Sequence, residues 1–233
     1  MSIALFIAMI LSMIVLVIVT LCKVAGASII IGLLASTLFV AIALTSYRKN
    51  PSDFRFFAYL FAGLVFSLGG DISMAMKKDG GVLFLIGVGC FAVAHILYFL
   101  GYCYKAKFRF KDGLLFLCFF VPNLFLVVFG GFNFGPLKVM VIIYAAIICL
   151  MLSKSISMAK LYRESPRQVV LLIIGNILFY LSDLTLLFFL FYPHAAPILR
   201  QINWMLYYPA QGLLALSFTY AVFKNKKIRN IKL

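Results

Sequence analysis

Long apolar runs separated by short polar loops make up almost the whole chain. Eight runs come close to the roughly 20 residues that a helix needs to cross a bilayer. They lie at 2–22, 26–46, 56–76, 82–102, 113–130, 137–158, 168–192 and 198–223. The loops between them carry the Gly, Pro, Asn and Asp residues that end helices. The pattern predicts an all-α fold, a polytopic membrane bundle of about eight transmembrane helices, with residues 1–233 forming a single domain.

Positive charge is divided unevenly between the two ends of these predicted helices. Of the 21 Lys and Arg residues, 16 fall in alternate loops and the C-terminal tail, and 5 fall in the remaining loops. Because cytoplasmic loops are enriched in Lys and Arg, the split predicts that both termini lie in the cytoplasm. The basic residues behind the net charge of +15 are then expected to set the topology and to contact anionic membrane lipids, so no nucleic-acid partner is expected.

The sequence gives weaker evidence on which membrane holds the protein. No basic segment precedes the first run, which is therefore expected to be a retained helix and not a cleaved signal peptide. Short loops and this topology favour a bacterial inner (cytoplasmic) membrane, and they fit an endoplasmic reticulum membrane as well. The oligomeric state is not indicated by the sequence.

Two aspartates, Asp71 and Asp183, lie inside predicted membrane helices of a chain with only six acidic residues. Each follows an arginine, Arg55 or Arg167, by 16 positions, which is about 24 Å along a helix. An acid at membrane depth is costly and usually functional, although either one alone could be a structural partner of a neighbouring helix. Burial and a second carboxylate both disfavour ionisation, so we expect a close pair that shares one proton. Such a pair can supply a general acid and a general base.

The two aspartates also belong to a weak echo between the halves of the chain. The segments AGLVFSLGGD (62–71) and IGNILFYLSD (174–183) both place Gly eight residues before Asp. In the helices that follow, His95 corresponds to Gln211. The echo favours a 4+4 pseudo-repeat, although apolar helices also resemble one another by chance.

Other polar side chains in or beside the predicted helices are candidates for contact with a substrate. Most such groups serve as hydrogen bonds between helices, and this alternative applies to each of them. The two outer cations, Lys78 and Arg200, could hold a phosphate or simply extend to the headgroup region. The predicted substrate-binding residues are His95, Asn176, Tyr207, Tyr208, Gln211, Lys78 and Arg200.

Metal chemistry is not favoured by the residues available. The chain has only two histidines, which excludes a three-histidine zinc site and leaves only a mixed site with Asp. We therefore predict no metal and no cofactor.

Four segments share their order and spacing with a known family. They are FAGLVFSLGGDISMAM (61–76), FAVAHILYFLGY (91–102), GNILFYLSDLTL (175–186) and YYPAQGLLALS (207–217). Over nearly its whole length the chain resembles the YhhN-like lysoplasmalogenases, a family of eight-helix membrane proteins. The resemblance implies hydrolysis of the vinyl ether of a lysophospholipid substrate, a 1-alkenyl lysophospholipid, to a fatty aldehyde and a glycerophospho-alcohol. It also implies that Asp71 and Asp183 are the catalytic pair and that no cofactor takes part.

The implied chemistry agrees with the residues. A vinyl ether is cleaved by protonating its β-carbon and adding water to the resulting cation, which a carboxylic acid and a carboxylate can do together. Ser182 precedes Asp183 and could donate a hydrogen bond to it, which favours Asp71 as the proton donor.

Two other functions remain open at this point. A proton- or cation-coupled transporter of a lipid or metabolite would also suit paired acids and a repeat, although matched Gly/Pro breaks are lacking. A purely structural membrane protein leaves both acids unexplained.

Overall fold

The computed structural model describes residues 1–24, 26–76, 81–161 and 163–221, and all regular secondary structure in these ranges is helical. The long helices are α1 (Ser2–Leu21), α2 (Ala27–Lys49), α3 (Phe54–Met76), α4 (Val82–Lys105), α5 (Phe110–Phe129), α6 (Lys138–Ser157), α7 (Pro166–Phe191) and α8 (Ile198–Leu216). Short 3-10 turns follow at η1 (Gly135–Leu137), η2 (Met158–Leu161) and η3 (Ser217–Tyr220). The predicted all-α fold is confirmed, with bounds close to those expected. The end of the eighth run, 222–223, lies outside the described residues.

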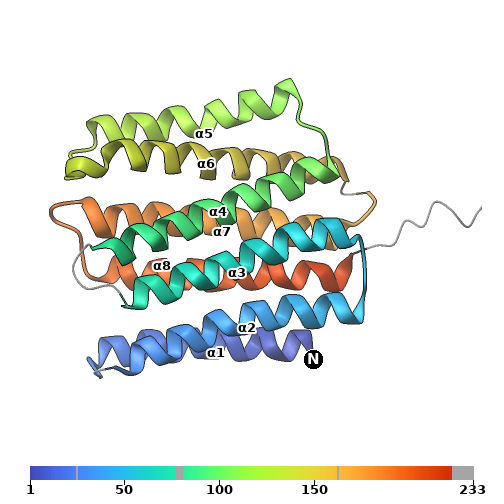
Figure 1. Cartoon of the computed structure of the whole chain (residues 1–233), viewed down its shortest axis with the longest axis horizontal. Coiled ribbons are helices and arrows are strands. Elements are labelled where there is room, and N and C mark those ends of the chain that lie inside the picture. Colours follow the sequence, from blue (N-terminus) through green and yellow to red (C-terminus); the bar gives the residue numbers. More distant parts are fainter. Residues whose placement is uncertain (25, 77–80, 162, 222–233) are drawn as a thin grey trace, which may run out of the picture.

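The helices run side by side along one direction, and consecutive helices point in opposite directions (Figure 1). Each consecutive pair packs as a hairpin: α1 with α2, α3 with α4, α5 with α6, and α7 with α8. The α1–α2 and α5–α6 hairpins form the two edges of the bundle, and the other two hairpins lie between them (Figure 1). Helix α8 also contacts α1, α2 and α3, while α6 contacts α4 and α7. The middle of the bundle is therefore built from α3, α4, α7 and α8.

Seven helices, α1 to α7, are long and apolar enough to cross a membrane, which supports an integral membrane protein. Helix α8 is more polar, yet it runs alongside α7 through the same bundle (Figure 1). Most of its polar side chains face the interior, since Gln201, Asn203, Tyr207 and Gln211 are buried, whereas Arg200 near its start is exposed. Most of the polarity of α8 thus belongs to the interior of the protein. The orientation of the termini and the kind of membrane stay predictions.

Two glycines allow the central hairpins to pack closely. A Cβ atom added to Gly63 of α3 would lie 2.3 Å from the Tyr98 ring of α4. A Cβ atom added to Gly175 of α7 would lie 3.1 Å from the Ala210 carbonyl oxygen of α8. These are the glycines that precede Asp71 and Asp183 by eight residues, so each sits at the same place relative to its aspartate. The 4+4 repeat itself stays a prediction.

A buried ion pair joins the two helices of the α5–α6 edge. Lys154 of α6 is fully buried, and its Nζ lies 2.6 Å from Asp112 Oδ2 and 3.0 Å from the Lys107 carbonyl oxygen. Asp112 also accepts the Arg109 backbone N–H at 3.0 Å and so caps the start of α5. Removing one member of a buried pair leaves the other charge without compensation, which destabilises a protein strongly.

We therefore expect Lys154→Met to lower the free energy of unfolding by about 3–5 kcal/mol, measured by thermal unfolding in detergent. The matched control is Lys105→Met, which removes a pair with Asp53 whose side chains are 32% and 30% exposed. An exposed pair contributes only about 0–1 kcal/mol. Equal shifts for the two variants would contradict a stabilising role for the buried pair.

Candidate active site

Asp71 projects from α3 and is held by hydroxyl groups of two other helices. Its Oδ2 accepts a hydrogen bond from Ser36 Oγ of α2 at 2.6 Å and another from the Tyr207 hydroxyl of α8 at 2.8 Å. The Tyr207 ring is fixed in turn by Phe179, on which it stacks with 5.4 Å between the ring centroids. The carboxyl group therefore has a defined position with two donors on one oxygen.

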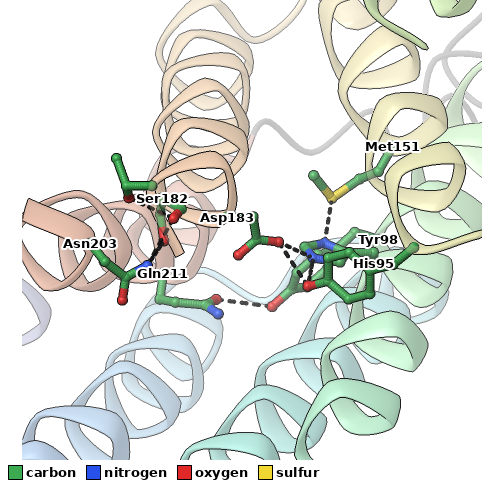
Figure 2. Close-up of polar contacts among 9 residues, drawn as sticks. His95, Tyr98, Met151, Ser182, Asp183, Asn203 and Gln211 are labelled. Atoms are coloured by element: carbon green, nitrogen blue, oxygen red, sulfur yellow. Dashed lines mark hydrogen bonds and ion pairs between the residues drawn. The ribbon is translucent and has the colours of Figure 1, made fainter. Parts of the chain in front are cut away.

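Asp183 projects from α7 and is held in the same way by two different helices. Its Oδ2 accepts the Tyr144 hydroxyl of α6 at 2.8 Å and lies 3.0 Å from His95 Nε2 of α4. Figure 2 shows the carboxyl group pointing at the imidazole ring. The other ring nitrogen, Nδ1, lies 3.2 Å from Met151 Sδ. The fully buried His95 is thus contacted at both nitrogens and fixes one side of Asp183.

The two aspartates are held by corresponding sets of helices. Each receives one partner from the helix that precedes its own, α2 or α6. Each receives the second partner from the last helix of the other half of the chain, α8 for Asp71 and α4 for Asp183. This exchange between halves is what a 4+4 repeat would produce.

Both aspartates line one cavity of about 320 Å³ between α1, α2, α3, α7 and α8, to which α4 adds Phe91. Within the described ranges, no hydrogen bond joins the two carboxyl groups, and each Oδ2 is engaged by partners of its own. The structure therefore brings the predicted pair to a common space and does not bring them into direct contact. A group bound in this cavity would have an acid on each side.

The same cavity contains a cation. Arg200 of α8 lines it together with Phe189 and Trp204. The guanidinium carbon lies 5.8 Å from the centroid of the Phe189 ring and 5.5 Å from that of Trp204. Contacts with aromatic faces hold a guanidinium group while leaving its N–H groups free to bind an anion. The predicted role of Arg200 in binding phosphate is compatible with this position and remains a prediction.

The remaining predicted residues divide into two groups. Tyr207 and Tyr208 line the cavity, and the Tyr208 hydroxyl donates to the Gly32 carbonyl oxygen at 3.2 Å. His95 is not among the cavity-lining residues of the described chain and reaches the site through Asp183. Lys78 lies outside the described residues.

Asn176 and Gln211 lie deeper in the core, away from the described walls of the cavity. Asn176 donates to the Tyr102 hydroxyl at 2.7 Å, and Gln211 accepts the Tyr98 hydroxyl at 3.0 Å. Figure 2 shows the second of these contacts. Both hydrogen bonds join α4 to the α7–α8 hairpin. Their position agrees with the alternative role, a hydrogen bond between helices, and not with contact with a substrate.

One expectation about Ser182 is wrong. Asn203 Nδ2 donates to Ser182 Oγ at 2.9 Å and to the Ser182 carbonyl oxygen at 2.8 Å (Figure 2). No hydrogen bond between Ser182 and Asp183 occurs in the described part of the chain. The cause is helix geometry, because consecutive side chains of a helix point in directions about 100° apart. The argument that made Asp71 the proton donor therefore fails.

Four residues at the site were not among the predicted site residues: Ser36, Tyr144, Asn203 and Trp204. Asn203 is a polar residue in an apolar run, and Trp204 is the single tryptophan of the chain, so both offered a signal. Ser36 offered none, since a serine in a membrane helix is commonly bonded to its own backbone.

The side chains of the site can themselves perform proton transfer. Two carboxyl groups, an imidazole and two tyrosine hydroxyls lie within two hydrogen-bonded sets around one cavity. In the ranges that the structure describes, no three His, Cys, Asp or Glu side chains gather in a way that could hold a metal ion. General acid and general base catalysis is the chemistry that this arrangement offers directly.

A comparison with protein families agrees with the sequence resemblance. The family model described as the YhhN family matches residues 27–218, which include every helix from α2 to α8. No curated protein and no solved structure matches the chain.

The donors to the two acids should matter more for stability than a hydroxyl bonded to a carbonyl group. We expect Tyr207→Phe and Tyr144→Phe each to lower the free energy of unfolding by about 1–3 kcal/mol, because each removes a donor from a carboxyl group inside the bundle. Tyr208→Phe is the matched control, with an expected loss of about 0.5–1.5 kcal/mol. Thermal unfolding in detergent measures all three, and a control loss as large as the others would contradict the expectation.

Proposed function

Because the chain belongs to the YhhN family, which is the lysoplasmalogenase family, we propose that it hydrolyses the vinyl ether bond of 1-alkenyl lysophospholipids. A lysoplasmalogenase-like function follows from the family in general, and this particular reaction is the proposal. It rests above all on one observation, two aspartates from separate helices that face a common cavity at membrane depth. The products are a fatty aldehyde and a glycerophospho-alcohol.

The reaction needs a proton and a water molecule on adjacent carbon atoms. A carboxylic acid protonates the β-carbon of the vinyl ether, which produces a cation stabilised by the ether oxygen. A carboxylate stabilises this cation and takes a proton from the water that adds to the α-carbon, as the two acids of glycosidases do. The hemiacetal then separates into aldehyde and alcohol. Asp71 and Asp183 supply the two carboxyl groups, and no cofactor is required.

The cavity also contains groups suited to the rest of the substrate. A lysophospholipid carries a phosphate close to its glycerol, and Arg200 supplies a cation on the cavity wall. Long apolar side chains such as Leu186 and Leu190 supply apolar surface for the hydrocarbon chain. The walls of the cavity thus provide a cation and apolar surface in addition to the two acids.

The alternative of a coupled transporter has no specific observation in its favour. Transporters commonly bind their substrates where membrane helices are interrupted. Helices α3 and α7 are continuous through Asp71 and Asp183, over Phe54–Met76 and Pro166–Phe191. We therefore keep the hydrolase as the proposed function.

Asp71→Asn and Asp183→Asn should each abolish aldehyde release from 1-alkenyl-lysophosphoethanolamine by the purified protein in detergent. Loss of a positioned general acid or base typically lowers the rate roughly 10²–10⁴-fold. Asp53→Asn is the matched control and should keep the rate, since Asp53 is a loop residue paired with Lys105. The ester-linked lysolipid should release no aldehyde.

The same assay defines how the proposal fails. Absence of aldehyde from the unaltered protein between about pH 5 and 8, the range in which carboxyl groups of this kind commonly act, would argue against the substrate. Unchanged rates in both Asp variants would argue against the mechanism.

Arg200→Gln should raise KM roughly 10-fold or more with a smaller effect on kcat, because a charge-assisted contact to the phosphate is lost. Arg167→Gln is the matched control. Arg167 lies at the start of α7, far from the α7–α8 turn that Arg200 follows, and its guanidinium lies over the Tyr220 ring. A KM for Arg200→Gln equal to that of the control would remove Arg200 from the binding site.

A further inference from the structure

A second cavity meets the first at Asp183. It has a volume of about 60 Å³ and lies between α3, α4, α6 and α7. The residues that line both cavities are Met74, Phe91, Asp183, Leu186 and Leu190. Asp183 is the one acid shared by both cavities, since Asp71 lines only the first. The two cavities are therefore adjacent spaces with a common wall at one of the two acids.

The walls of the two cavities differ in chemistry. Apart from Asp183, the second cavity has one polar side chain on its described walls, Tyr144, whose hydroxyl already donates to Asp183. Its other walls are aliphatic, aromatic or methionine side chains such as Val88, Met140 and Leu187. The first cavity, in contrast, presents a guanidinium, an amide and several hydroxyl groups. Nothing in the second cavity could bind a glycerol or a phosphate, whereas an alkyl chain would lose no hydrogen bond there.

We propose that the two cavities divide the substrate at Asp183, with the glycerophosphate in the first cavity and the start of the hydrocarbon chain in the second. This inference rests on the proposed function. It commits the second cavity to one occupant, the alkyl part of the same lysolipid that Arg200 holds by its phosphate.

The division assigns roles to the two acids. In a vinyl ether the β-carbon carries the hydrocarbon chain, and the α-carbon carries the oxygen of the glycerol. With the chain in the second cavity, the β-carbon faces Asp183 and the α-carbon lies on the side of Asp71. Asp183 is then the proton donor and Asp71 the base, the reverse of the expectation that depended on Ser182.

The protons balance over the cycle. Asp183 gives its proton to the β-carbon, and water bonds through its oxygen to the α-carbon while giving a proton to Asp71. The hemiacetal then breaks its bond between the α-carbon and the glycerol oxygen. That oxygen takes the proton from Asp71, and the hemiacetal hydroxyl gives its proton to Asp183. Both acids return to their starting states, and one water molecule is consumed.

The small volume of the second cavity limits what it can recognise. Val88 and Met140 on its wall are only half-buried, so the cavity lies near the edge of the bundle. It can enclose the first few carbons of the chain, and the remainder extends towards the lipid. The enzyme should therefore distinguish very short chains from long ones and show little preference among long chains.

Filling the second cavity tests this division. Val88→Phe places a ring in the cavity, and Val93→Phe is the matched control on the same helix, because Val93 is 37% exposed and lines neither cavity. We expect Val88→Phe to lower kcat/KM roughly tenfold or more for the hexadecenyl substrate, and much less for the prop-1-enyl substrate, whose chain is a single methyl group. Equal losses for both substrates, or equal losses in both variants, would overturn the proposal.

A binding measurement on the unaltered protein separates this proposal from the proposed function. The probe is a 1-alkyl lysophosphoethanolamine that cannot be hydrolysed and carries a diazirine on the third carbon of its chain. Photolabelling of Phe84 or Val88 of α4, or of any residue of α6, supports the division and with it the donor role of Asp183, because none of these residues lines the first cavity. Labelling of α1, α2 or α8 overturns the division and the donor role of Asp183. Labelling that excess unlabelled lipid does not reduce overturns them as well. Absence of aldehyde in the activity assay, in contrast, would overturn the proposed function whatever the labels show.

Discussion

A carboxyl group inside a membrane needs hydrogen-bond donors from the protein, because the hydrocarbon supplies none, and this need organises the centre of the bundle. Asp71 takes its donors from α2 and α8, and Asp183 takes its partners from α4 and α6. Every second helix thus contributes one side chain to an acid. Part of the polarity of α8, unusual for a membrane helix, follows from the same need, since its buried Tyr207 donates to Asp71.

The sequence predicted the helices well because the length of an apolar run is visible without any knowledge of packing. It also singled out Asp71 and Asp183, since a carboxyl group in an apolar run has a recognisable cost, and the structure places both on one cavity while their role stays a prediction. It could not identify Ser36 as a partner, and it wrongly paired Ser182 with Asp183, because a contact between helices depends on how each helix is rotated. The same limit explains why Asn176 and Gln211, predicted to touch a substrate, lie in the core between helices.

The buried charge of Lys154, outside the site, is also satisfied by protein groups, but it contributes to helix packing and not to a cavity. Lys154 is as deeply buried as His95, but its partners Asp112 and the Lys107 carbonyl belong to one end of the α5–α6 edge. Its charge is satisfied locally and borders none of the cavities found here, so it serves the packing of two helices. A buried ionisable residue therefore indicates chemistry only where part of it still faces an open space, as both aspartates do.

The contacts of α8 also bear on how the chain enters the membrane. Helices are inserted in chain order, and a segment as polar as α8 is poorly stabilised by lipid alone. Its packing partners include α1 and α2, which lie far before it in the chain, as well as α7 immediately before it. Helix α8 is therefore stabilised in the membrane by α1 and α2 as well as by α7. The cavity that both aspartates line is therefore complete only once α8 has packed, since α8 brings Tyr207 and Arg200 with it.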